Sequence, residues 1–371
     1  MIKGRLFVVN ENTLQNTIRN NIASIETPQP IGRRDWLKTI ADIMADMLQI
    51  EIGDYIFLWE MKTSTQKSRI HGVYRAISKP YYELSSPTDC YPFKIKIEKA
   101  FNFNIPLNEY DILNCPYIKS PLWTVIGKKV AGKPRGTSPL SPTEVQSIIT
   151  LLIGRNVNYT FIPYDEARII NVPNSLKIDY LNNGDSPIVR TLSDIDPNAL
   201  PYFNDDHTLK YEKILETIFN QEMSSRNSNF FRQIGINVSK VTWFCNYLPY
   251  SIERAEMDYL VMESDDGFTL SRLYLIEFIR ESIDKDHINK SMVYSKWINE
   301  TLALGESITQ PIIICSKSYN FMEGETSTSR RNRMDDMNNY ITECEVEFST
   351  KPLQVFTYNF STATPIFVRK R

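Results

Sequence analysis

The chain has 371 residues, of which 42% are hydrophobic and 12% aromatic, so it can build one large packed domain or two ordinary ones. Its net charge of −2 excludes a globally basic nucleic-acid binder, and any surface for nucleic acid must be a local patch. No apolar run approaches the roughly 20 residues of a membrane-spanning helix, so we expect no membrane partner.

Cysteine usage indicates a reducing compartment. The five cysteines are scattered, odd in number and without CxxC spacing, which argues against a zinc site and against a disulfide framework. The first residues run straight into the strand-like RLFVVN, so we expect no signal peptide and a cytoplasmic location.

The first 155 residues alternate between helix-like and strand-like patterns. Apolar residues at helical spacing predict helices over 13–25, 35–50 and 139–152. Strands are expected over 5–10, 55–60, 70–78 and 93–100, with a further strand-like run around Trp123. Residues 156–206 are rich in Asn, Pro and Asp, which predicts a linker with short strands of its own.

The stretch around residues 251–297 organises the remainder of the chain. Two short apolar runs, 259–262 and 273–276, are joined by the turn sequence DDG and predict a β-hairpin. Asp258 precedes the first run and Glu277 follows the second, so the two carboxylates can meet at one place on the sheet. Paired oxygen ligands of this kind suit a divalent metal ion such as Mg²⁺.

Helices are predicted on both sides of this hairpin. In the helix expected over 286–304, Lys290 and Tyr294 are one turn apart. In the helix expected over 207–220, Glu212 and Glu216 share a face, either beside the metal or as a solvated stripe.

Basic clusters could contact a phosphate backbone. Arg330, Arg331 and Arg333 begin a predicted helix, while Lys133 and Arg135 lie in a loop with Gly and Pro. Lys and Arg in such places give sequence-independent affinity, although a solvated surface is the alternative interpretation.

The first part of the chain resembles the EVE and YTH families. The segments that carry the resemblance are RLFVVNENTLQNTIRNNIAS, GDYIFLWE, HGVYRAISKPYY, YPFKIKIEKAFNFNIPL and GKPRGTSPLSPTEVQSIITLL. The resemblance implies a PUA-like β-barrel with helices and a pocket for one flipped base held between aromatic faces. Methyladenine readers have a tryptophan where this chain has 21–24 (NIAS), so the cage would use Trp59, Tyr91 or Trp123; core packing is the alternative.

The second part resembles the PD-(D/E)xK nuclease superfamily. The elements that carry the resemblance are a helix with Glu, three strands including Asp258 and Glu277, a helix, QPIIICSK, SRRNRMDDMNNYITEC and LQVFTYNF. The resemblance implies a mixed central sheet flanked by helices and a phosphodiesterase using Mg²⁺ or Mn²⁺. Asp258 and Glu277 would hold the metal, and Glu212 or Glu216 would complete the acidic shell.

One position departs from the nuclease pattern. The superfamily has a lysine two residues after the glutamate, where this chain has Ile279. Lys290 could supply the missing charge from the following helix; alternatively the site is inactive and the domain only binds nucleic acid.

Together these features predict a reader domain over 1–155, a linker over 156–206 and a nuclease-like domain over 207–371. The expected function is a modification-dependent, restriction-type endonuclease that acts on double-stranded DNA as a homodimer. The alternatives are a catalytically inactive module that binds DNA or RNA, and an RNA-binding regulator.

Overall fold

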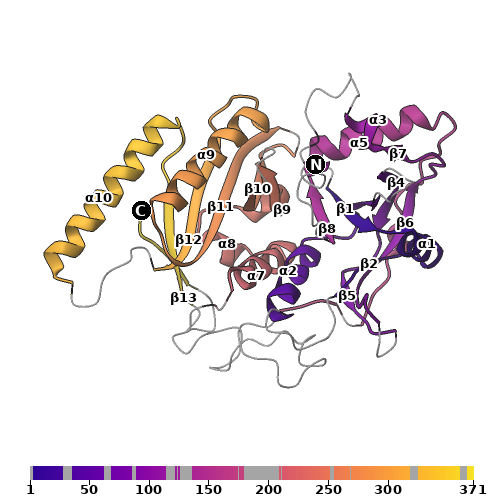
Figure 1. Cartoon of the computed structure of the whole chain (residues 1–371), viewed down its shortest axis with the longest axis horizontal. Helices are drawn as coiled ribbons and strands as arrows, with labels where there is room; N and C mark the ends of the chain where they lie inside the picture. Colours follow the sequence, from indigo (N-terminus) through magenta and orange to yellow (C-terminus); the bar gives the residue numbers. More distant parts are fainter. Residues whose placement is uncertain are drawn as a thin grey trace. The chain divides into compact units, whose positions relative to one another are not determined.

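The computed structural model describes residues 3–27, 36–61, 68–85, 89–113, 122, 124–125, 136–173, 175–178, 209, 211–250, 255–267, 269–317, 325–359 and 366–371 (Figure 1). The chain forms two compact units. The first is Met1–Lys177 with Tyr247–Ala255, and the second is Ile178–Asn246 with Glu256–Arg371. No helix in the described part of the chain has the length and apolar character needed to cross a membrane.

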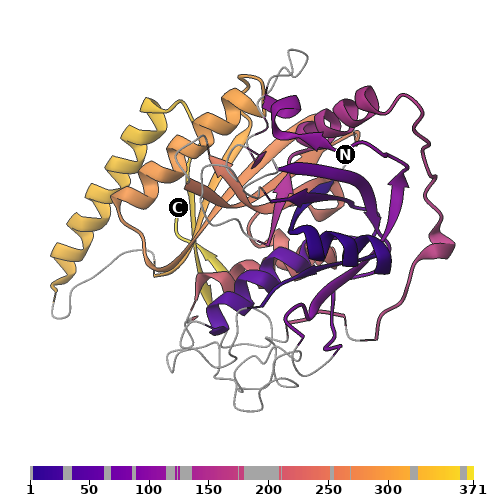
Figure 2. The same cartoon turned by 45° about the vertical axis from the view of Figure 1, so that its right-hand side comes forward.

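The first unit contains a curled sheet of eight strands (Figure 2). The strands are β1 (Gly4–Val9), β2 (Ile22–Ile25), β3 (Tyr55–Glu60), β4 (Arg69–Ala76), β5 (Tyr81–Tyr82), β6 (Phe93–Phe101), β7 (Leu107–Asn108) and β8 (Thr137–Leu140). Their order is β2-β6-β4-β3-β1-β8, with β5 beside β6 and β7 beside β4. The β1–β3 pair is parallel, whereas β1–β8, β3–β4 and β4–β6 are antiparallel.

The helices of this unit among the described residues are α1 (Glu11–Asn20), α2 (Trp36–Leu48), α3 (Glu109–Leu113) and α5 (Pro142–Arg155). Helix α5 starts with a capping box, in which Ser141 and Glu144 each accept a hydrogen bond from the other's backbone N–H, at 3.3 and 2.9 Å. Its apolar face, through Val145, Ile148 and Leu152, completes a core with residues of the sheet.

Two predicted helices of this unit have different limits. The helix expected over 13–25 ends at Asn20, because Asn21 adopts the left-handed conformation (φ 54°), and the next four residues form β2. The helix expected over 139–152 begins at Pro142, because Pro139 belongs to β8.

Much of the described part of the predicted linker packs against the first unit. Ile162 N–H donates to Ala100 O (2.9 Å), Ile170 N–H to Ile77 O (2.7 Å) and Leu176 N–H to Pro80 O (2.8 Å). A short 3₁₀ helix, Glu166–Arg168, lies within this stretch. Residues 179–206 lie outside the described part of the chain.

The second unit contains a mixed sheet of six strands in the order β14-β13-β12-β11-β10-β9. The strands are β9 (Val241–Tyr250), β10 (Ala255–Ser264), β11 (Leu270–Ser282), β12 (Thr309–Lys317), β13 (Gln354–Asn359) and β14 (Ile366–Arg369). β11, β12 and β13 are parallel, while β10 runs antiparallel to β11 and β14 runs antiparallel to β13. Together with the curled sheet and helices of the first unit, this gives the chain a mixed α+β architecture, the class that the two resemblances lead us to expect.

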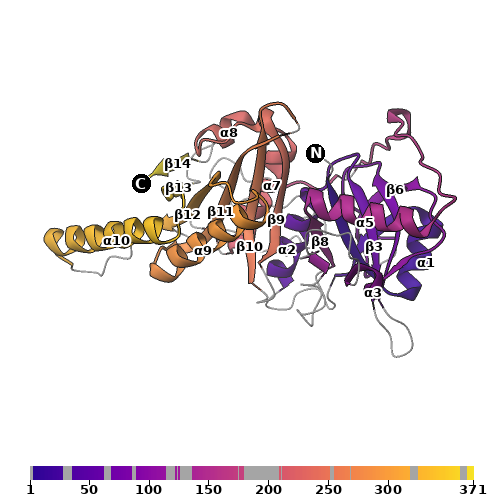
Figure 3. The same ribbon diagram turned by 90° about the horizontal axis from the view of Figure 1, so that it is seen from above.

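Helices cover both faces of this sheet. They are α7 (Glu212–Ser224), α8 (Ser228–Arg232), α9 (Lys285–Thr301) and α10 (Ser327–Glu347). Ile288 and Met292 of α9 and Ile341 of α10 share one core with Ile279 of β11. Figure 3 shows α9 and α10 on one side of the sheet and α8 on the other.

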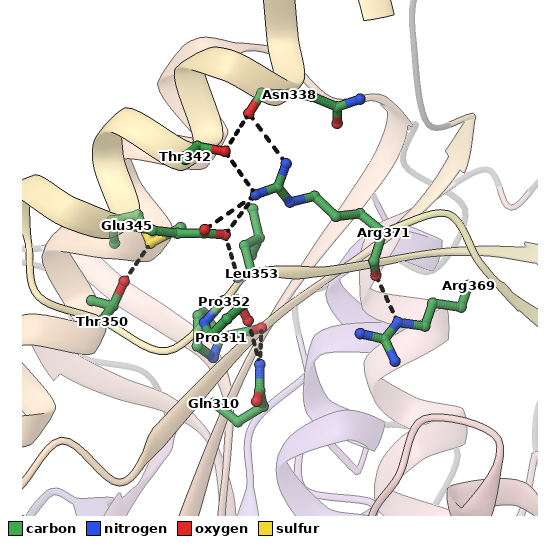
Figure 4. A network of polar contacts seen from close by, with 11 residues as sticks. Gln310, Pro311, Asn338, Thr342, Glu345, Thr350, Pro352, Leu353, Arg369 and Arg371 are labelled. Atoms are coloured by element: carbon green, nitrogen blue, oxygen red, sulfur yellow. Dashed lines mark hydrogen bonds and ion pairs between the residues drawn. The ribbon is translucent and has the colours of Figure 1, made fainter. Parts of the chain in front are cut away.

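The chain end is held against α10, as Figure 4 shows. The guanidinium of Arg371 lies 3.1 Å from both carboxylate oxygens of Glu345 and donates to Asn338 O at 3.1 Å. The preceding strand, β14, pairs with β13 and had not been predicted from its four residues.

Candidate functional site

The hairpin of β10 and β11 places Asp258 directly opposite Glu277. Tyr259 pairs with Ile276 in the antiparallel register, so the next pair along the two strands is Asp258 and Glu277. Glu277 Oε1 accepts a hydrogen bond from Asp258 N–H at 3.4 Å, and Asp258 Oδ2 accepts one from Phe278 N–H at 3.0 Å. Cross-strand partners project from the same face of a sheet, so the two carboxylates converge.

Helix α9 adds a cation to this pair. The helix is capped by Asp284, whose side chain accepts from His287 N–H at 2.9 Å. Six residues after this cap, Lys290 Nζ lies 2.6 Å from Glu277 Oε2 and 5.3 Å from the ring centroid of Tyr294. The site therefore holds two carboxylates and one ammonium group from three successive elements.

Burial and the mutual repulsion of the two carboxylates shift the pKa values of this cluster. Burial, and secondly the charge of Asp258, raises the pKa of Glu277 to about 8 from its ordinary 4.5, although Lys290 opposes the rise. Burial lowers the pKa of Lys290, but the Asp258 and Glu277 carboxylates outweigh it and raise that pKa above its ordinary range. Two neighbouring carboxylates beside a single lysine among the described residues are a favourable place for further positive charge.

These residues fit a divalent metal ion in the chemistry of their donors. Asp258 and Glu277 provide the oxygen ligands that Mg²⁺ and Mn²⁺ prefer, and Glu277 is held in a fixed direction by its backbone and Lys290 contacts. A bound cation would relieve the repulsion between the two carboxylates.

The acidic residues of α7 do not join this pair. Phe219 of α7 packs on Phe278 with ring centroids 4.8 Å apart, and Phe278 faces the opposite side of β11 from Glu277. Glu216 contacts Lys213 at 2.7 Å, and Glu212 accepts from Arg280 N–H at 3.2 Å. Within the described residues, no group of three or more His, Cys, Asp or Glu is arranged to hold a metal, so the expected third carboxylate is not in place.

Ile279 has a packing role. It is 5% exposed and belongs to the core shared by β11, α9 and α10. It lies on the same face of β11 as Glu277, so the face that would hold the superfamily's lysine is filled there by an apolar side chain.

The three aromatic residues expected to hold a base have different environments. Trp59 is 3% exposed and packs in the core of the first unit, which was the alternative interpretation of its sequence position. Tyr91 is partly buried, and its hydroxyl donates to Glu26 at 3.5 Å. Trp123 lies outside the described residues.

The expected phosphate-binding residues are described only in α10. Arg330 and Arg331 are exposed near its start, while Arg333 forms an ion pair with Glu325 at 3.0 Å. Lys133 and Arg135 lie outside the described residues.

The first unit contains a pocket of about 220 Å³ that was not predicted from the sequence. It is lined by residues of α1, β4 and β6 and of the segment after β6, including Ile18, His71, Lys99 and Phe103. These residues are far apart in the chain and follow no motif. The only local signal was the aromatic alternation in the segment AFNFN.

Comparison with known proteins gives a partial likeness. No protein-family model and no curated protein matches the sequence. One similar solved structure is an Agrobacterium tumefaciens protein, with 11% identity and a TM-score of 0.28, covering 44% of this chain and 99% of that protein.

Two further similar structures contain nucleic acid. The YTH domain of Zygosaccharomyces rouxii MRB1, in complex with N6-methyladenosine RNA, has 18% identity and a TM-score of 0.26, covering 40% of this chain and 86% of that domain. Human THYN1, in complex with 5-methylcytosine-containing DNA, has 11% identity and a TM-score of 0.25, covering 40% of this chain and 97% of that protein.

Proposed function

We propose that this chain is a metal-dependent DNA endonuclease whose first unit holds a modified base. The observation that supports the proposal most strongly is the convergence of Asp258, Glu277 and Lys290 on one face of the β10–β11 hairpin. Two carboxylates can hold a metal ion that activates water, and a lysine can offset the charge of a phosphate during phosphodiester hydrolysis.

The order of elements in the second unit supports the same class. A helix precedes three successive strands, and a helix, a parallel strand, a further helix and another parallel strand follow. This order is consistent with the PD-(D/E)xK core that the sequence resembles. In that comparison Lys290 takes the place of the lysine that Ile279 replaces, because its ammonium group reaches Glu277 from α9.

Each residue then has a distinct task. A bound Mg²⁺ or Mn²⁺ ion supplies Lewis acidity and a more acidic water molecule. Asp258 and Glu277 would hold that ion, and their hydrogen bonds to the neighbouring strand would keep them oriented. Lys290 would offset the negative charge of the scissile phosphate, and the nearby ring of Tyr294 would favour its charged form.

The base-reading part of the proposal rests on the sequence resemblance to the EVE and YTH families. The structures of MRB1 and THYN1 contain nucleic acids with a methylated base, and we extend this class of ligand to the present chain. Cutting both strands of a duplex needs two hydrolytic sites, so we propose that the active form is a homodimer.

A second candidate function is a binding module without hydrolysis. The apolar packing of Ile279 and the absence of a third carboxylate among the described residues favour it. Such a protein would retain affinity for nucleic acid and would have no metal-dependent activity.

Digestion of a panel of DNA duplexes, each with one kind of base modification, separates the two functions. With Mg²⁺ or Mn²⁺ present, we expect the wild type to cut at least one duplex, and Asp258→Asn and Glu277→Gln to abolish cutting. Asp265→Asn is the matched control, because Asp265 is an exposed carboxylate in the turn of the same hairpin. Failure of the wild type to cut any duplex, or unchanged cutting by the two variants, would overturn the hydrolytic proposal.

A further inference from the structure

The pocket in the first unit has an aromatic lining and a basic rim. Tyr74 of β4, Phe101 at the end of β6 and Phe103 line it, and the exposed Lys99 also contributes to it. His71 lines another part, where its Nε2 lies 2.8 Å from Glu60 Oε2. The pocket thus offers ring surfaces, one cation and a polar edge in a single place.

The wall formed by the segment after β6 is fixed by a buried side chain. Asn156, at the end of α5, accepts hydrogen bonds from the backbone N–H groups of Asn104 (2.9 Å) and Ile105 (2.8 Å). Its Nδ2 also donates to Ile105 O at 2.9 Å. These three bonds hold the wall in place before any ligand arrives, which lowers the entropic cost of binding.

Gly72 shapes another part of the pocket wall. Its φ is +52°, and a Cβ atom built there would lie 2.9 Å from Cε2 of the Tyr74 ring. Only glycine allows this backbone conformation beside the tyrosine ring without strain. The position of Tyr74 in the pocket therefore depends on the absence of a side chain at residue 72.

Aromatic rings continue from the pocket to the protein surface. Phe101 and Phe103 stack with centroids 5.1 Å apart and an interplanar angle of 5°. Phe161 lies 5.1 Å from Phe101, and Tyr159 lies 5.8 Å from Phe103. Phe161 is 48% exposed and Tyr159 is 39% exposed, so a continuous aromatic surface faces solvent. Such patches on otherwise polar surfaces mark binding sites.

The size of the pocket limits its occupant. Pockets for drug-sized ligands have volumes of about 300–1,000 Å³, and this one is smaller, at about 220 Å³. It suits a single ring system more than a whole dinucleotide. Aromatic stacking beside a lysine is the arrangement that single-stranded nucleic acid uses, because bases stack while the cation meets phosphate.

We infer that this pocket binds one unpaired base of a single-stranded nucleic acid, with Lys99 facing its phosphate and the exposed rings of Phe161 and Tyr159 stacking on neighbouring bases. The inference rests on the proposed function for nucleic acid as the ligand class. It places the base among residues other than Trp59, Tyr91 and Trp123. It also predicts that the first unit prefers an unpaired strand to an intact duplex.

Fluorescence anisotropy of the full chain with a short labelled single-stranded DNA, in EDTA so that no cutting occurs, tests this inference. Stacking is worth about 1–3 kcal/mol per base, so Phe103→Ala is expected to weaken binding by about fivefold to 150-fold. Ile18→Trp is the second variant. Ile18 lines the pocket and is 38% exposed, so a larger side chain there would fill the pocket without disturbing the packing of the core. This variant is expected to weaken the affinity for the single-stranded DNA by at least about tenfold.

Lys99→Gln should weaken binding and flatten its dependence on salt, since one phosphate contact is lost. Tyr110→Ala is the control, because Tyr110 is 48% exposed and does not line the pocket. Wild-type affinity in Ile18→Trp and Lys99→Gln, in a chain that still binds and cuts nucleic acid, would overturn this inference alone. A wild type that binds no nucleic acid of any kind would overturn both this inference and the proposed function.

Discussion

The stability of the second unit should depend on pH through Glu277. Its pKa is raised from 4.5 to about 8 in the folded chain, because the carboxyl group is buried beside Asp258. Folding therefore favours the protonated form. The stabilising contribution of this group is fully present below pH 4.5 and is lost as the pH rises through about 8.

The magnitude follows from the size of the shift. Each pKa unit corresponds to about 1.36 kcal/mol, so the rise from 4.5 to about 8 removes as much as about 5 kcal/mol of unfolding free energy above pH 8. Glutamine cannot ionise, so Glu277→Gln should lack this loss. The free-energy difference between wild type and variant should shift by several kcal/mol between about pH 5 and pH 9, in favour of the variant at high pH.

Urea denaturation in EDTA, followed by circular dichroism across this pH range, measures that difference. Titrating groups that do not interact with Glu277 are common to both proteins and cancel in the comparison, which leaves the group formed by Asp258, Glu277 and Lys290 as the source of any difference. Asp265→Asn should follow the wild type, because Asp265 lies exposed in the hairpin turn. Parallel stability profiles for wild type and Glu277→Gln would show that the pKa of Glu277 is not raised by burial. That result would also remove the electrostatic argument for a cation site.

Three further predictions concern the metal and the two cores. Mg²⁺ affinity, measured by isothermal titration calorimetry, should rise by up to about tenfold per pH unit below pH 8, since Glu277 must lose its proton to bind; a flat profile would contradict this role. Phe219→Ala should destabilise the second unit by about 3–5 kcal/mol, because its fully buried ring contacts five other rings, whereas Phe219→Leu should cost less. Asn156→Ala should cost about 2–4 kcal/mol in urea denaturation, because it leaves the N–H groups of Asn104 and Ile105 unpaired; wild-type stability would show that these bonds do not hold the segment.

The hairpin could be predicted because its information is local. Two apolar runs and the turn sequence DDG fix an antiparallel pairing, and this pairing alone brings Asp258 opposite Glu277. The position of Lys290 near Glu277 could also be predicted from the sequence, because the helical pattern places this residue shortly after the strand that carries Glu277. In each case a few neighbouring residues determine the geometry.

Other features depend on contacts between distant segments. The sequence could not show that α7 packs on the Phe278 side of β11, which separates Glu216 from Glu277. Strand β2 was predicted as the end of a helix, because its apolar residues fit the helical period as well as the strand period. The left-handed conformation of Asn21, which ends the helix before β2, could not be seen in this pattern. The pocket beside Phe103 joins segments from Ile18 to Pro106, so no local pattern could have predicted it.

A titration of the metal-free chain with Mn²⁺, followed by electron paramagnetic resonance at pH 8, tests most directly whether Asp258 and Glu277 share a cation. We predict that the wild type and Asp265→Asn bind an ion that Asp258→Asn and Glu277→Gln do not bind. Equal Mn²⁺ binding by all four proteins, or none by the wild type, would contradict the metal site on which the proposed hydrolysis depends.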